Sequence, residues 1–382
     1  MYHYHYLDAL SAKADGIWTK AFQKTENMGK ADAILVRSAP MQTLPLPENL
    51  LAIGRAGAGV NNIPLKKCSD AGIVVFNTPG ANADSVAELT LCAMLLGCRD
   101  VLGGIEWVKA NAKIDNMAKA VEKEKSRFAG VQLRDRSIGI IGLGAVGRRV
   151  AGLCSAMGAV VYGFDPYFPG TVDGRIARVE TVDAIYDRCD IISLHVPLTD
   201  ATSRMIKEET IAKMKNGVCL VNMARGELVD EDAMASALAA GKVKVYITDF
   251  PNYKTAGMPG CVAIPHLGAS TREAEENCAG MAVAQVVDYL ENGNISNSVN
   301  FPDCHMGACS AAGRIVILHR NIPNSLGQFT AAVAAEGINI AALLNKSKAD
   351  LAVTMLDLDC AAPQCLADRI SGMAGVLRVR PI

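Results

Sequence analysis

The chain has almost no net charge, and it lacks an apolar run long enough to cross a membrane. Its 38 lysines and arginines nearly balance 39 aspartates and glutamates, which leaves a formal net charge of −1. This balance predicts neither nucleic acid nor an acidic membrane as a partner. The longest charge-poor apolar run, residues 89–98, is far shorter than the ~20 residues that a bilayer requires, and it is typical of a buried core helix.

The chain also lacks a secretory signal and any C-x-x-C pair among its 12 cysteines. The first residues, 2–6, contain neither a basic segment nor a long apolar core. These absences predict a cytoplasmic protein whose cysteines are small buried apolar residues rather than disulfides. His3 and His5 would share one face of a strand, but no third ligand accompanies them, so we expect no metal.

The clearest motif is S-I-G-I-I-G-L-G-A-V-G at residues 137–147. Its apolar start predicts a buried parallel strand that runs directly into Gly142, Gly144 and Gly147, in the pattern G-x-G-x-x-G. The first glycine permits a tight turn, the second lets the backbone approach a pyrophosphate, and the third allows a helix to pack closely on the strand.

A helix is predicted over 148–157, and a second strand over 160–164 ends at Asp165. The helix N-terminus offers N–H groups to phosphate, and the carboxylate accepts the adenosine ribose hydroxyls. Because this carboxylate would repel a 2′-phosphate, the motif predicts NAD rather than NADP as the cofactor.

Short apolar strands on either side of this motif lead into polar or glycine-rich loops, as in open parallel sheets. They are predicted at 33–36, 50–53, 73–76, 191–194, 219–222, 245–248 and 262–264. The last four lead to His195, Arg225, Asp249 and His266. Ligands bind beyond the carboxyl ends of such strands, so we expect these four side chains to surround one site.

Helices are predicted from Val86 to about residue 102, capped by Asp84 or Ser85, then over 106–128 with a connecting loop, and over 270–291. Beyond a Gly-, Asn-, Ser- and Pro-rich stretch, the elements follow the ferredoxin-like order β-α-β-β-α-β. These strands and helices are predicted at 314–318, 325–336, 338–343, 351–358, 363–373 and 376–379, with 351–358 alternating as a half-buried strand.

The predicted fold class is therefore α/β, with two doubly wound parallel-sheet domains of Rossmann type and a C-terminal ferredoxin-like domain. We predict a substrate-binding domain over 1–83 and 270–300, a dinucleotide-binding domain over 84–269, a linker over 301–312 and a regulatory domain over 313–382.

The segments N-M-A-R-G at 222–226, P-H-L-G-A-S-T at 265–271 and S-V-A-E-L at 85–89, with the glycine motif, resemble the NAD-dependent D-2-hydroxyacid dehydrogenases. The resemblance runs from about residue 30 to the end. Segments 319–323 and 337–340 resemble the effector-binding ACT domain that some members carry. This domain favours the branch that oxidises D-3-phosphoglycerate to 3-phosphohydroxypyruvate, the first step of L-serine biosynthesis.

The resemblance implies that His266 is the base for the substrate hydroxyl and that Arg225 binds the carboxylate and the 2-oxygen. It implies cofactor contacts at Gly142, Gly144, Ala145, Val146, Gly147, Asp165, His195, Pro197, Ala224, Asp249 and Gly268. It implies substrate contacts at Arg37, Ser38, Ala58, Gly59 and Asn82, and L-serine contacts at His319, Asn321 and Asn339. Lys125 and Arg127 are weaker phosphate candidates, and a solvated helix end explains them equally well.

The chain departs from the family at two positions. Lys254 stands where a family glutamate pairs with the histidine, and no glutamate occurs in 249–266. We therefore expect Asn252 or a residue from elsewhere to orient His266, or the base to act without a partner, and we hypothesise that His266 titrates lower than in members with the glutamate. Asn324 stands where the ACT domain usually has glycine, so serine feedback is a weaker expectation.

Three alternatives stay open at this stage. The first is another D-2-hydroxyacid dehydrogenase, such as a glyoxylate or hydroxypyruvate reductase. The second is an NAD-sensing binding protein without catalysis, and the third is an amino-acid sensor, which leaves the glycine motif unexplained. In each case we expect a homodimer or homotetramer, because strands of small C-terminal domains often pair across subunits.

Overall fold

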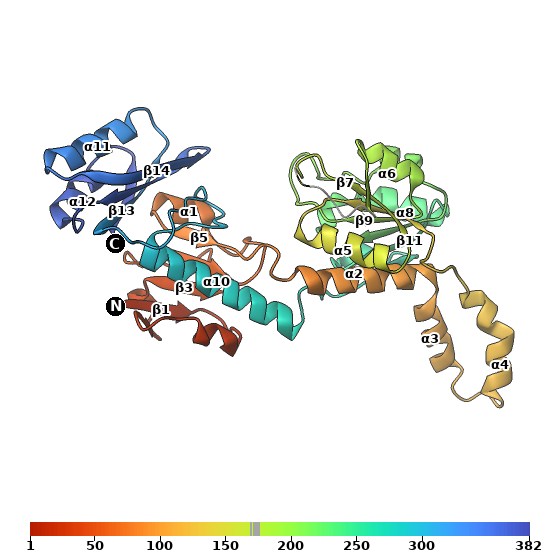
Figure 1. The fold of residues 1–382 in the computed structure, drawn as a ribbon. Coiled ribbons are helices and arrows are strands. Elements are labelled where there is room, and N and C mark those ends of the chain that lie inside the picture. The colour runs from red at the N-terminus through yellow and green to blue at the C-terminus, as the bar shows by residue number, and fades with distance from the viewer. Residues whose placement is uncertain (169, 171–175) are drawn as a thin grey trace. The chain divides into compact units, whose positions relative to one another are not determined.

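The computed structural model describes residues 1–168, 170 and 176–382 (Figure 1). The chain divides into two compact units: unit 1 comprises residues 1–81 and 275–382, and unit 2 comprises residues 82–274. Each unit has its own sheet and core, and each is described by itself. Among the described residues, no helix has both the length and the apolar character that a membrane crossing needs.

Unit 2 is built on a seven-stranded parallel sheet in the order β12-β11-β10-β9-β6-β7-β8. The strands are β6 (Ser137–Ile141), β7 (Val160–Phe164), β8 (Ile176–Arg178), β9 (Ile191–Leu194), β10 (Val218–Asn222), β11 (Val243–Thr248) and β12 (Cys261–Ala263). The strand order reverses direction between β6 and β9, and ligands of open α/β sheets bind at such a point. The predicted Rossmann-type fold is confirmed.

Helices cover both faces of this sheet. Helices α2 (Ala83–Cys98) and α5 (Ala145–Ala156) share one apolar core with the sheet, and α6 (Val182–Arg188), α7 (Glu208–Lys213) and α8 (Glu231–Ala239) share the other. Two short helices, η4 (Gly226–Leu228) and α9 (Tyr253–Ala256), lie in loops beyond strand ends. Strand β9 is buried at every position because both of its faces are covered.

The predicted helix over 86–102 differs from the structure at both ends. Helix α2 is preceded by Asn82 rather than capped by Asp84 or Ser85, and it ends at Cys98 because Arg99 is extended. Asp100 then caps a new helix, accepting a hydrogen bond from the Gly103 N–H. This helix, α3 (Val101–Ala110), leads through α4 (Met117–Glu124) and η3 (Lys125–Phe128) in an arm that extends from the sheet of unit 2 (Figure 1).

Unit 1 contains a five-stranded parallel sheet in the order β2-β1-β3-β4-β5. Its elements are β1 (Tyr2–Tyr6), η1 (Ala12–Gly16), β2 (Phe22–Lys24), η2 (Met28–Lys30), β3 (Ala33–Val36), β4 (Ala52–Arg55), α1 (Leu65–Asp70) and β5 (Val74–Phe76). Helix α1 packs on one face, and the long helix α10 (Arg272–Asn292) packs on the other. The alternation of His3 and His5 predicts a strand at β1 but does not place it in the sheet, and only Tyr4 of this strand is buried.

The C-terminal part of unit 1 is an antiparallel sheet in the order β14-β15-β13-β16. Its elements are β13 (Gly313–Arg320), α11 (Ser325–Ala335), β14 (Ile340–Lys348), β15 (Leu351–Leu358), α12 (Gln364–Ser371) and β16 (Val376–Pro381). The predicted ferredoxin-like order is confirmed. The prediction that β15 is half-buried is wrong, because α11 and α12 cover one face of the sheet and the other joins the core around α10.

Candidate functional site

The glycine loop lies at the point where the strand order of unit 2 reverses. Gly142 follows β6 with φ of +97°, and a Cβ there would lie 2.5 Å from the carbonyl oxygen of His195. A Cβ at Gly147 would lie 1.9 Å from the carbonyl oxygen of Gly142, so α5 and β6 pack too closely for any side chain. By contrast, no atom lies within 4 Å of a Cβ built at Gly144, which leaves this backbone open to a ligand.

The start of α5 suits an anionic ligand. Ala145, Val146 and Gly147 form its first turn after Gly144, and no side chain caps this end. Asp165 lies beside the loop, where its carboxylate accepts hydrogen bonds from Leu143 N at 2.8 Å and Tyr167 N at 2.9 Å. N–H groups for a pyrophosphate and a carboxylate for ribose hydroxyls are thus placed together.

His195 and Pro197 follow β9 beside this loop. The Nε2 atom of His195 lies 2.9 Å from Ser193 Oγ, and burial lowers the pKa of His195 to about 4. The imidazole is therefore neutral at neutral pH. Pro197 is exposed, and its carbonyl oxygen accepts a hydrogen bond from Thr202 Oγ1 at 2.6 Å.

Asn222, at the end of β10, fixes the loop that carries Ala224 and Arg225. Its buried side-chain oxygen accepts hydrogen bonds from Ala224 N at 3.1 Å and Arg225 N at 3.3 Å, and its amide donates to Arg225 O at 2.7 Å. Asn222 belongs to a motif found in the sequence, but no role was predicted for it. A buried amide at the end of an apolar strand is the signal that could have identified it.

Asp249 follows β11 and is 2% exposed. Its Oδ2 atom accepts a hydrogen bond from Gly268 N at 3.3 Å, whereas Oδ1 has no hydrogen-bond partner among the described residues. Burial raises the pKa of Asp249, and the nearby His266 and Arg225 act against this shift. A buried carboxylate oxygen without a partner fits a donor from a bound ligand.

The two predicted catalytic side chains, Arg225 and His266, meet at Phe250. The centroids of the His266 and Phe250 rings are 4.7 Å apart, with a 48° angle between the planes. The guanidinium carbon of Arg225 lies 5.8 Å from the centroid of the same phenyl ring. The His266 backbone has φ of +37°, and its N–H donates to Asp249 O at 3.0 Å and Ile264 O at 2.9 Å. The structure thus brings the two groups together at one edge of the sheet.

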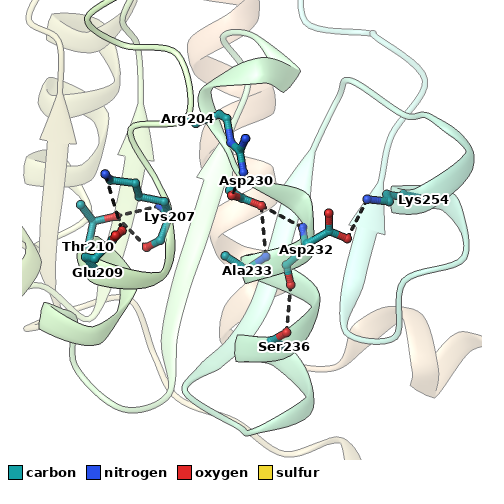
Figure 2. A network of polar contacts seen from close by, with 9 residues as sticks. All are labelled: Arg204, Lys207, Glu209, Thr210, Asp230, Asp232, Ala233, Ser236 and Lys254. Carbon is teal, nitrogen blue, oxygen red and sulfur yellow. Dashed lines mark hydrogen bonds and ion pairs between the residues drawn. The ribbon is translucent and has the colours of Figure 1, made fainter.

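Lys254, at the family glutamate position, points to α8 instead of His266. Its ammonium donates to Asp232 Oδ1 at 2.7 Å, as Figure 2 shows. The expectation that Asn252 orients His266 is wrong, because its amide donates to Glu231 and its oxygen caps α9. In the part of the chain that the structure describes, no hydrogen bond reaches the His266 ring.

Figure 2 also shows how the start of α8 is held. Asp230 pairs with Arg204 and accepts hydrogen bonds from the Asp232 and Ala233 N–H groups. Arg204, Asp230 and Asp232 line an open cavity of about 820 Å³, and Asp249, Phe250 and His266 line it as well. Within the described ranges, no group of three or more His, Cys, Asp or Glu side chains is arranged to hold a metal ion.

In unit 1, Asp8 shapes the loop that contains Arg37 and Ser38. Its carboxylate accepts hydrogen bonds from Arg37 N at 2.7 Å, Ser38 N at 2.6 Å and Ala39 N at 2.8 Å. The guanidinium of Arg37 forms an ion pair with Glu275 at 2.7 Å. Asp8 was not predicted as part of the site, and it lies just beyond β1.

The other predicted substrate residues fall in both units. Ala58 and Gly59 follow β4 in unit 1, where Ala58 O accepts a hydrogen bond from Asn77 Nδ2 at 2.7 Å. Asn82 precedes α2 and belongs to unit 2, as do Arg225 and His266. The substrate roles of all these residues stay predictions.

Lys125 and Arg127 lie on η3 at the end of the arm. They form local ion pairs with Glu122 at 2.5 Å and Glu124 at 3.0 Å, respectively. All but Glu124 have side chains that are more than half exposed, so these contacts also suit a solvated helix end.

The three predicted effector residues lie at two ends of the C-terminal sheet. His319 is buried at one end, where its ring nitrogens contact Arg320 O at 2.8 Å and Thr354 Oγ1 at 2.9 Å, and burial lowers its pKa. Asn321 follows it, and its amide donates to Ala349 O at 3.3 Å. Asn339 lies at the opposite end, bonded through its N–H to Asp359. The structure therefore does not bring Asn339 to the other two within one chain.

Comparison with known proteins gives consistent matches. Residues 91–268 match the model of the D-isomer specific 2-hydroxyacid dehydrogenase NAD binding domain. A D-3-phosphoglycerate dehydrogenase of Methanocaldococcus jannaschii is 38% identical over 291 residues, which are 73% of this chain and 53% of that protein. The chain thus spans about half the length of this relative.

Two further proteins match this chain over a larger share of their own length. A hydroxypyruvate reductase of Thermotoga maritima is 38% identical over 273 residues, which are 68% of this chain and 85% of that protein. The crystal structure of an NAD⁺-bound 3-phosphoglycerate dehydrogenase of Entamoeba histolytica has a TM-score of 0.61 and 26% identity, covering 78% of this chain and 98% of that one.

Proposed function

Because this chain belongs to the D-isomer specific 2-hydroxyacid dehydrogenase family and carries its NAD-binding domain, we propose that it oxidises D-3-phosphoglycerate to 3-phosphohydroxypyruvate. This would be the first step of L-serine biosynthesis, carried out in the cytoplasm. The observation that carries the proposal is the convergence of Arg225 and His266 on Phe250, next to a buried Asp249 oxygen without a partner.

The residues of unit 2 fit NAD. The open backbone at Gly144 and the uncapped start of α5 would hold the pyrophosphate, and Asp165 would hold the adenosine ribose. The orphaned Oδ1 of Asp249 would accept a hydrogen bond from the nicotinamide amide. When bound, NAD⁺ supplies the acceptor for the hydrogen and the electron pair of the C–H bond that breaks at the substrate's C2.

The chain's own groups complete the reaction. The O–H bond of the substrate breaks, its proton passes to the His266 imidazole, and the oxygen's electrons form the C=O bond as the C2–H electrons leave. The guanidinium of Arg225 binds the carboxylate through its paired N–H donors and stabilises the negative charge that develops on the 2-oxygen. Neutral His195, already paired with Ser193, would line the cofactor site rather than accept the proton.

A substrate panel tests this proposal. NADH formation at 340 nm is measured with D-3-phosphoglycerate, D-2-hydroxyglutarate, D-lactate and D-glycerate, and the largest kcat/KM is expected with the phosphorylated acid. The phosphoglycerate dehydrogenase names of two matched proteins and the basic Arg37 support this order. Preference for D-glycerate would favour the hydroxypyruvate reductase alternative that the Thermotoga relative keeps open. NADH binding without any turnover would favour an NAD sensor.

We propose that the α3–α4 arm joins two copies of the chain. No residue of either helix is buried, and Val101, Leu102, Ile105 and Val108 are each at least 40% exposed. Contiguous apolar patches of this kind on a monomer mark interaction surfaces. Because we expect a homo-oligomer, we assign a second copy of this chain as the partner of the arm.

The double variant Ile105→Glu/Val108→Glu is expected to convert a dimer or tetramer into a smaller species in size-exclusion chromatography with light scattering. Its matched control is Glu106→Gln, which removes a charge from a side chain that is 74% exposed on the same helix. A monomeric parent, or an oligomer that persists in the double variant, would contradict this assignment.

We also propose L-serine as the ligand of the C-terminal sheet. Because His319 and Asn321 lie at the end opposite Asn339, a site that uses all three needs a second copy, and the unpaired edge of β14 gives a surface for such pairing. A rate unchanged by saturating L-serine would remove this part of the proposal without affecting the dehydrogenase assignment.

A further inference from the structure

One phenylalanine ring lies against both groups that would carry out the reaction. The Phe250 ring is 4.7 Å from the His266 ring and 5.8 Å from the guanidinium carbon of Arg225, both measured to its centroid. A phenyl ring carries negative charge on its faces and attracts cations within about 6 Å. Both neighbours are cationic during the proposed reaction, Arg225 throughout and His266 once it has taken the proton.

The backbone holds Phe250 firmly in this place. Its N–H donates to Thr248 Oγ1 at 3.1 Å, and Thr248 is fully buried at the end of β11. Its Cβ lies 3.4 Å from a Cβ built at Gly226, so the start of the Phe250 side chain lies against the loop that carries Arg225. Side chains fixed in this way by a strand end hold their neighbours more accurately than side chains on free loops.

Two polar side chains of the same loop are committed elsewhere, and the nearby Asp249 carboxylate accepts a hydrogen bond from Gly268 N. Lys254 is bonded to Asp232, and Asn252 is bonded to Glu231. No hydrogen bond from a described residue reaches the His266 ring. The ring contact with Phe250 is a side-chain contact through which this chain can orient its base.

We propose that Phe250 is a positioning residue for His266 and Arg225. Its ring face fixes the orientation of the His266 imidazole and the Arg225 guanidinium, and it stabilises the positive charge that His266 gains. The inference rests on the proposed dehydrogenase function, and it goes further by assigning the support of the base to an aromatic face instead of a carboxylate.

Three variants test it kinetically. Phe250→Leu keeps an apolar side chain but removes the ring face, and it is expected to lower kcat about 3- to 30-fold while KM changes less than about 2-fold. Phe250→Tyr keeps the face and is expected to retain kcat within about 2-fold. The matched control is Tyr253→Leu, which removes a ring that is 98% exposed on the same loop and is expected to leave kcat unchanged.

Parent-like kcat in Phe250→Leu, or an equal loss in Phe250→Tyr, would overturn the proposal. NADH affinity, measured by fluorescence titration, should be the same in all three variants, which separates positioning from a damaged fold.

A second measurement does not depend on turnover. In the NADH-bound protein with ¹³C-labelled histidine, the ring signals of His266 should move in Phe250→Leu and stay in place in Tyr253→Leu, because the phenyl ring current is lost only in the first. Unmoved His266 signals would overturn the proposal. If the parent oxidises none of the tested acids, the proposed function fails, and this spectrum still decides whether Phe250 orients His266.

Discussion

Replacing His266 with asparagine is expected to lower kcat about 10²- to 10⁴-fold, the usual contribution of a positioned general base. Asparagine tolerates the left-handed backbone at this position, where φ is +37°, so the loop should keep its shape. The measured quantities are kcat for D-3-phosphoglycerate oxidation and the Kd for NADH, and only the first should change strongly.

The matched control for this experiment is His305→Asn, which replaces an exposed histidine of unit 1 and should leave kcat unchanged. The pH profile adds a second check. Burial holds the pKa of His195 at about 4, so His195 does not change charge between about pH 6 and 9. A kcat of His266→Asn within about 3-fold of the parent across this pH range would contradict the role of His266.

Replacing Arg314 with leucine is expected to lower the free energy of unfolding of unit 1 by about 3–5 kcal/mol. Arg314 is 1% exposed and forms a two-bond ion pair with Asp357 at 2.5 and 2.9 Å. Its remaining nitrogen donates to Asn292 O at 2.7 Å and Gly307 O at 2.9 Å. Loss of this guanidinium leaves the Asp357 carboxylate and the carbonyl groups of Asn292 and Gly307 without their donor. It also removes the hydrogen bond that joins the C-terminal sheet to the end of α10.

Urea unfolding followed by the fluorescence of Trp18 measures this loss. Trp18 stacks on Tyr4 in unit 1, and a Trp107→Phe background removes the second tryptophan of the chain, which lies in unit 2. The control Lys66→Met breaks an ion pair whose lysine is 91% exposed, and it should cost less than about 1 kcal/mol. If both substitutions lowered the free energy of unfolding equally, burial would add nothing to the stabilisation by the ion pair of Arg314 and Asp357.

The features of the site that could be predicted from the sequence are local ones. The spacing of Gly142, Gly144 and Gly147 after an apolar run specifies the turn. In the structure a side chain would clash at Gly142 and at Gly147, whereas the space beside Gly144 is open to a ligand. Arg225 and His266 were predicted to surround one site because both follow strands of one parallel sheet, and in the structure both lie beside Phe250.

The features that could not be predicted depend on contacts between distant segments. Asp8, just beyond β1, holds the loop of Arg37 through contacts that the sequence pattern does not reveal. Strand β15 is buried on both faces only because α10 packs against one of them. Asn339 lies far from His319 because β14 and β13 are joined through β15 in antiparallel register, which a motif match does not report.

The most direct test of the account is the crystal structure of the complex with NADH and oxamate, an unreactive 2-oxo-acid analogue. The account predicts that the oxamate keto oxygen lies about 2.6–3.2 Å from a nitrogen of His266, that Arg225 binds its carboxylate, and that the nicotinamide amide meets Oδ1 of Asp249. A complex in which the imidazole at 266 and the guanidinium at 225 both face solvent, away from the nicotinamide ring, would contradict it.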